Sequence, residues 1–132
     1  MLKSQQYADM VFKKVSALAQ EDGERPKRYK SLCKRSGGIF RTVGLVQFAT
    51  FLEAKGRKEP HYADLARHLR EELHEINLLR SEDSTDYLAQ IRRLPLPAYM
   101  HVSRTVLHLL QWHKRLGEIL IEGIPEDDGA ED

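Results

Sequence analysis

The feature that most constrains the fold is the spacing of the apolar residues. They recur at intervals of three and four along most of the chain, and no segment alternates between apolar and polar residues for long. Such intervals place side chains on one face of an α-helix, whereas a strand requires a period of two. The spacing therefore predicts an all-α fold. We expect about six helices, over residues 4–19, 26–34, 39–54, 61–80, 85–94 and 95–121.

The length of 132 residues suits one hydrophobic core, and we expect a compact single-domain bundle over residues 1–121. The segment 39–54 is apolar around most of its circumference, which predicts that it is the central helix. Gly44 in its middle is expected to allow close packing against another helix. The run Ser36–Gly38 is expected to end the helix before it.

The segment 61–80 has a narrower apolar stripe, which predicts an amphipathic helix at the surface. Its other face carries charged and polar residues that we interpret as solvated pairs. These residues are Asp64, Arg67, His68 and Glu71.

Charge is distributed unevenly along the chain, although the net charge is only +1. Residues 1–58 carry 13 Lys and Arg against 5 Asp and Glu, whereas residues 59–121 carry 8 against 9. Residues 122–132 carry six acidic residues, no basic one and few apolar ones, which predicts a disordered acidic tail. A basic half beside an acidic tail suggests that the protein binds a polyanion, although such a tail could equally serve only solubility.

The strongest basic cluster runs from Glu24 to Arg41, where seven of eight charged residues are basic. A solvated helix face normally mixes charges, so this cluster with Tyr29 interleaved favours contact with phosphates and stacking on bases. The candidate nucleic-acid-binding residues are Arg25, Lys27, Arg28, Lys30, Lys34, Arg35, Arg41, Arg104 and Arg115.

The last two candidates belong to a polar stripe in the segment 95–121. Its members are His101, Arg104, His108, Gln111 and Arg115, spaced by three and four residues. The spacing places them on one helix face, away from the apolar stripe. That face is either simply solvated or directed toward nucleic acid or another subunit, since Arg and His pair with phosphates and stack on bases.

No complete catalytic or metal-binding motif is present. The chain lacks the glycine-rich phosphate loops, and Cys33 has no partner that the sequence can assign. The pair Glu71 and His74 has the spacing of one half of a di-iron site, but no second copy exists. His68 and Glu72 could hold a metal only weakly, and we interpret these histidines as surface residues. We expect no enzymatic activity, no metal and no cofactor.

The sequence also favours a cytoplasmic protein. The single cysteine cannot form an internal disulfide, and the first ten residues lack a secretory apolar run. The most apolar stretch, residues 39–52, is too short for a membrane span and contains Arg41. We therefore expect no membrane association.

Several segments resemble a known family. They are Gln6–Ala8, Tyr29–Leu32, Ile39–Leu45, Phe48–Gly56 and Gln111–Arg115. In this order and spacing they are similar to the small subunit of type III-B (Cmr-type) CRISPR effector complexes. The chain departs from the family pattern at three places. Val43 replaces an asparagine, Phe40 is inserted before Arg41, and a glycine of the pair Gly37–Gly38 replaces a proline.

The resemblance implies a small, non-catalytic, all-helical subunit. Copies of such a subunit stack along a filament of backbone subunits, which hold the guide RNA and carry the cleaving residues. The implied partners are the backbone and large subunits, copies of this chain, and guide and target RNA. The alternative is a helical adaptor that uses the same basic surface to bind an acidic protein.

Overall fold

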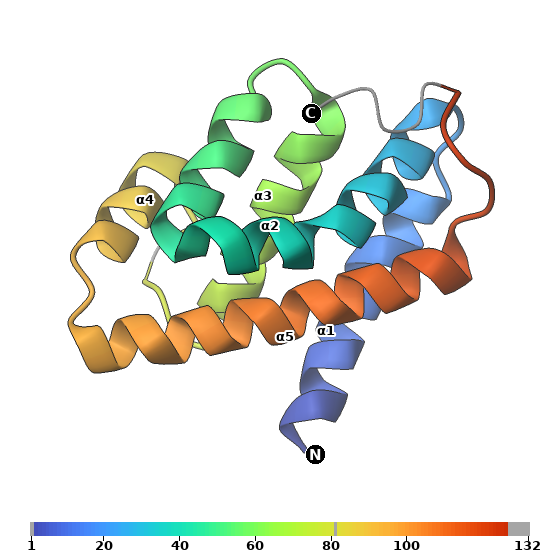
Figure 1. The fold of residues 1–132 in the computed structure, drawn as a ribbon. Helices are drawn as coiled ribbons and strands as arrows, with labels where there is room; N and C mark the ends of the chain where they lie inside the picture. The colour runs from blue at the N-terminus through green and yellow to red at the C-terminus, as the bar shows by residue number, and fades with distance from the viewer. Residues whose placement is uncertain (1, 81, 127–132) are drawn as a thin grey trace.

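The computed structural model describes residues 2–80 and 82–126, and helices form most of this part of the chain (Figure 1). The prediction of an all-α fold is confirmed, but the described residues form five helices rather than six. The helices are α1 (Lys3–Ala19), α2 (Glu24–Lys55), α3 (Pro60–Glu75), α4 (Ser84–Arg92) and α5 (Leu96–Leu120).

The helix count differs because the predicted helices 26–34 and 39–54 are joined in α2. The predicted break at Ser36–Gly38 is wrong, since these residues are helical. Glycine lowers helix stability by only about 1 kcal/mol, and the packing of α2 against α5 outweighs that cost. The buried hydroxyl of Ser36 also bonds within the helix, donating to the carbonyl of Leu32 at 2.7 Å.

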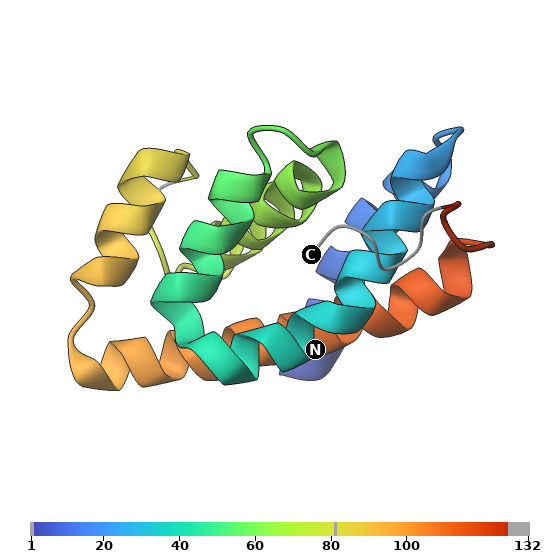
Figure 2. The ribbon, with the colours of Figure 1, turned by 45° about the horizontal axis from the view of Figure 1, so that its top comes forward.

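The interruption of α2 lies instead at Gly44, whose φ of 83° and ψ of 175° are not helical. The helix changes direction near its middle, in the teal part of the ribbon (Figure 2). The break frees the backbone N–H of Val46, which donates to the hydroxyl of Tyr99 on α5 at 3.2 Å. The expectation that Gly44 allows close packing is wrong, because no described atom lies within 4 Å of a Cβ built there. Gly44 is needed for its backbone conformation.

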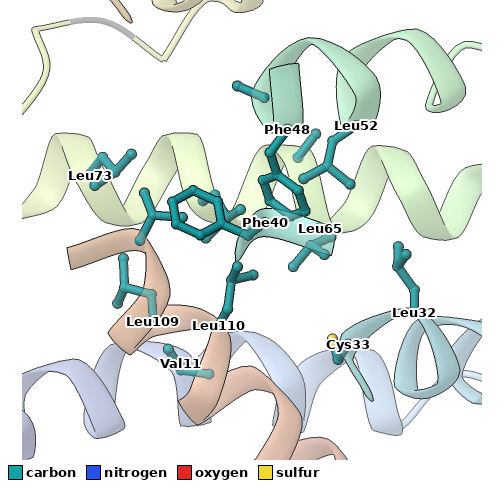
Figure 3. Packing of buried hydrophobic residues seen from close by; sticks show 14 of the residues in the cluster. Val11, Leu32, Cys33, Phe40, Phe48, Leu52, Leu65, Leu73, Leu109 and Leu110 are labelled. Atoms are coloured by element: carbon teal, nitrogen blue, oxygen red, sulfur yellow. The ribbon is translucent and has the colours of Figure 1, made fainter. Parts of the chain in front are cut away.

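The α2 helix is central, as predicted, and packs against α3, α4 and α5. The arm of α2 that follows Gly44 lies beside α4 at one end of the molecule, and α5 extends across the bundle (Figures 1 and 2). Buried apolar side chains from all five helices form one core (Figure 3). Burial of large apolar side chains is the main favourable term in folding, so this core provides most of the stability.

Two boundaries illustrate how local sequence sets the helices. The α3 helix ends at Glu75, earlier than predicted, where Asn77 takes a positive φ of 63° and Leu78 N–H donates back to Leu73. Asparagine tolerates this left-handed conformation better than most residues. At α4 the helix begins with an N-terminal cap, since the Asp83 carboxylate accepts from Asp86 N–H at 3.1 Å.

The first residues of the predicted tail pack against the start of α2. The Lys30 ammonium donates to the carbonyl of Ile121 at 2.9 Å, Pro125 is buried, and Glu126 N–H donates to the Glu24 carboxylate at 2.9 Å. The first residues of the tail therefore contact the bundle, and the disorder predicted for residues 122–132 stays a prediction. Residues 127–132 lie outside the described part of the chain.

Candidate nucleic-acid interface

A basic groove lies between α2 and α5, and several of the candidate residues meet there. The groove has a volume of about 270 Å³ and is lined by four cationic side chains. They are Lys34 and Arg41 on α2 and Lys114 and Arg115 on α5. None of the described residues that line the groove is acidic. The Arg115 guanidinium lies 3.8 Å from the Glu118 carboxylate, in an exposed pair that contributes little.

The helical spacing of α2 builds one wall of this groove. Lys34, Gly37, Gly38 and Arg41 follow at intervals of three, one and three residues and share a face. The two glycines leave space between the cations, and the Arg41 guanidinium lies 3.4 Å from the position of a Cβ on Gly37. Both glycines are helical in the structure, so the pair shapes the groove rather than ending the helix.

The structure brings together only some of the nine predicted residues. Lys34, Arg41 and Arg115 line the basic groove. Arg35 and Lys30 line a neighbouring cavity of about 530 Å³, together with Lys34 and Glu118. The Arg35 guanidinium is held there by the hydroxyls of Ser31 and Tyr62, at 3.4 and 3.3 Å.

Other predicted residues have partners within the chain. Arg25 donates twice to the buried Asp64 carboxylate, at 2.7 and 2.6 Å, which raises the pKa of Arg25. Lys27 lies 3.5 Å from Glu24, and Lys30 binds the Ile121 carbonyl. Arg28 is half-buried, and Arg104 lies at a different groove between α1 and α5.

Sequence reasoning missed Lys114 as a groove residue. It directly precedes Arg115 and is not a member of the predicted polar stripe. Its side chain faces α2 at the groove. The available signal was its interval of three from Gln111, which also lines the groove.

Behind the groove, a buried polar network connects α2, α3 and α5. The Tyr29 hydroxyl lies 2.7 Å from His68 Nδ1 and 2.8 Å from His113 Nδ1. His113 Nε2 lies 3.0 and 2.9 Å from the two oxygens of the Glu72 carboxylate. His68 and Asp64 were predicted to be solvated, but both are buried, because α3 directs this face toward α2 and α5.

One arrangement of protons satisfies every member of the network. Arg67 donates to His68 Nε2 at 3.4 Å, so His68 donates through Nδ1 to the Tyr29 oxygen. The Tyr29 hydroxyl then donates to His113 Nδ1, and His113 donates through Nε2 to Glu72. Burial raises the pKa of Tyr29, so the hydroxyl keeps its proton. Because all four groups are buried, we assign the network a role in fixing three helices together.

Burial, together with the neighbouring His113 and Arg67, lowers the pKa of His68 from 6.5 to about 2. Below pH 6.5 the unfolded chain therefore binds a proton that the folded chain does not. We expect the free energy of unfolding to fall by about 1.4 kcal/mol between pH 7.5 and 5.5 from this group alone. Denaturant titrations should show this dependence weakened by that amount in a His68→Asn variant. Equal pH dependence in the native chain and the His68→Asn variant would contradict the assignment.

The structure changes the interpretation of Cys33 as a nucleophile and of His68 and Glu72 as metal ligands. Cys33 is buried, and burial raises the pKa of its thiol, so the side chain stays protonated and is a poor nucleophile. His68 and Glu72 do not face a shared metal position, since each bonds to a different partner. Within residues 2–80 and 82–126, no three His, Cys, Asp or Glu side chains gather as a metal site.

No helix in that part of the chain could cross a membrane.

The fold matches that of a CRISPR-associated protein. The crystal structure of a CRISPR-associated Cmr5 family protein from Thermus thermophilus superposes with a TM-score of 0.77 and 24% sequence identity. The match covers 92% of this chain and 100% of that one, so the two proteins share their fold.

The sequence comparison identifies the family. The chain belongs to the Cas_Cmr5 family of CRISPR-associated proteins, because residues 3–120 match the model of that family. It is also 29% identical, over 123 residues, to the CRISPR system Cmr subunit Cmr5 of Thermus thermophilus. That alignment covers 91% of this chain and 96% of the relative. The resemblance to the small subunit of type III-B Cmr-type complexes is thereby confirmed.

Proposed function

We propose that this protein is a non-catalytic, cytoplasmic small subunit of a type III-B RNA-guided complex that lines the guide and target RNA channel with its basic groove. Copies of it stack beside the backbone subunits, and the large subunit completes the assembly. The observation that carries the RNA contact is the groove between α2 and α5. Four cations converge there, and none of the described lining residues is acidic.

The groove is suited to a nucleic-acid backbone rather than to bases. Lys and Arg side chains bind phosphates as charges, and such contacts give affinity without reading the sequence. A small subunit that contacts any guide and target pair needs this kind of binding. Gly37 and Gly38 leave the space that a phosphate requires between Lys34 and Arg41.

Charge reversal at the groove tests the proposal. The double variant Lys34→Glu, Lys114→Glu should bind a fluorescent single-stranded RNA at least tenfold more weakly at low salt, measured by anisotropy. Four phosphate contacts on a single strand give a log–log salt slope of roughly −3, and loss of two contacts should reduce its magnitude by about 1.4. The thermal midpoint should change little, because substitutions at the protein surface usually have small effects on stability.

A matched variant controls for net charge. Lys58→Glu, Arg92→Glu reverses two exposed cations outside the groove and should retain most of the affinity and the full salt slope. Equal losses in the two variants would show that binding follows net charge and not the groove. If the native chain binds no RNA but binds an acidic polypeptide, the adaptor interpretation replaces this proposal.

A further inference from the structure

A second groove lies between α1 and α5 and has a different chemistry. Its volume is about 360 Å³, within the range of about 300–1,000 Å³ that is common for ligand sites. Its walls combine aromatic rings with two cations, and none of the described residues that line it is acidic. The side chains that carry the argument are Lys3, Tyr7, His101, Arg104, His108 and Trp112.

The positions of these side chains separate a rim from a floor. His101, Arg104 and His108 are exposed on α5, and Lys3 is exposed at the start of α1. Tyr7 is nearly buried, and Trp112 is half-buried against the core. An aromatic floor beneath cations is the combination with which proteins hold a single-stranded nucleotide, since the rings stack on the base and the cations bind its phosphate.

An exposed ridge of α5 connects the two grooves. Arg104, His108, Gln111 and Arg115 follow at intervals of four, three and four residues, and all four are exposed. The first two line the aromatic groove, and the last two line the basic groove. With a rise of 1.5 Å per residue, Arg104 and Arg115 are about 16 Å apart along the helix. A single strand could therefore contact both grooves within a few nucleotides.

We propose that the groove between α1 and α5 binds one unpaired nucleobase of a single-stranded RNA whose backbone occupies the basic groove. The base stacks against Trp112 and the imidazole of His108, and Arg104 and Lys3 bind the adjoining phosphate. This inference rests on the proposed RNA-binding function. It adds a contact with a base to an RNA-binding mode that otherwise involves only the RNA backbone.

Trp112 is the only tryptophan of the chain and lies in the groove, so its fluorescence reports directly on an occupant. Titration with a single-stranded RNA should quench this fluorescence. An abasic ribose–phosphate oligomer of equal length and charge should bind the basic groove without quenching. A variant with both His108→Ala and Arg104→Ala should bind the RNA about 5- to 100-fold more weakly. Its affinity for the abasic oligomer should fall only by the loss of the one phosphate contact that Arg104 makes. The matched change Arg92→Ala, at an exposed arginine of α4, should affect neither.

The outcomes separate this inference from the proposed function. If the labelled RNA does not bind at all, both fail. If the RNA binds in a manner that depends on Lys34 and Lys114, but Trp112 is not quenched and the groove variant is unaffected, only the base site is overturned. Fluorescence that changes with protein concentration in the absence of RNA would show that a second copy covers the groove, which also overturns the base site.

Discussion

We expect the His113→Ala variant to lose about 3–5 kcal/mol of unfolding free energy, measured by denaturant titration at pH 7.5. His113 is fully buried, and its Nε2 binds both oxygens of the equally buried Glu72 carboxylate. Without the imidazole, the one partner that this carboxylate keeps among residues 2–80 and 82–126 is Lys14, whose ammonium lies 4.0 Å away. The Tyr29 hydroxyl also loses its acceptor at 2.8 Å. A buried charge and a buried donor without close partners make this one of the most costly single changes in the chain.

A double-mutant cycle separates this electrostatic cost from the loss of packing. In a Glu72→Ala background, the same His113→Ala change should cost about 1–3 kcal/mol less, because no carboxylate remains to be stranded. If the two changes are simply additive, the imidazole acts only by filling space. A His113→Ala loss below about 1 kcal/mol would contradict the hydrogen-bonded network as described.

Two glycines of α2 should respond in opposite directions to alanine. Gly44 has a φ of 83° and a ψ of 175°, a region that is nearly exclusive to glycine, so Gly44→Ala should cost about 1–3 kcal/mol through backbone strain. The kink also supports the hydrogen bond from Val46 N–H to Tyr99. Thermal and denaturant unfolding would both register the loss.

Gly38→Ala is the matched control, since both sites have open space for a methyl group within the described residues. Gly38 is helical, so alanine there should raise stability by about 0.5–1 kcal/mol. The two variants should therefore differ by about 1.5–4 kcal/mol although they add the same atoms. Equal effects would show that α2 is not bent at Gly44 in solution.

The sequence predicted those helices whose apolar stripe is narrow and whose ends carry clear signals. The α1 helix is an example, since residues 4–19 were predicted and Lys3–Ala19 are helical. The position of the break in α2 could not be predicted from composition, because glycine is compatible with both a break and a continuous helix. Gly37 and Gly38 continue the helix, and only tertiary packing decides that Gly44 interrupts it. The backbone angle of a glycine cannot be read from its neighbours.

The candidate site, too, could be predicted from the sequence only in part. Lys34, Arg41 and Arg115 could be selected by charge clustering, since they lie on exposed helix faces. The burial of Asp64 and His68 could not be predicted from the sequence, because each side chain binds a partner on another helix. Asp64 also removes Arg25 from the free cations of the cluster. Which charges of a helix remain available to a ligand depends on long-range contacts that local spacing does not encode.

The packing of α1 determines when the chain can complete its fold during synthesis. The α1 helix packs mainly against α5, the last of the described helices, so about a hundred residues must be synthesised before its main partner exists. At the usual rate of about 5–20 residues per second, this delay is about 5–20 s. During that interval the apolar face of α1, including Val11 and Val15, lacks its main partner and has only the smaller contact with α3 available. Folding of this domain is thus completed only once α5 has been synthesised, and until then the nascent chain is the form most in need of a chaperone.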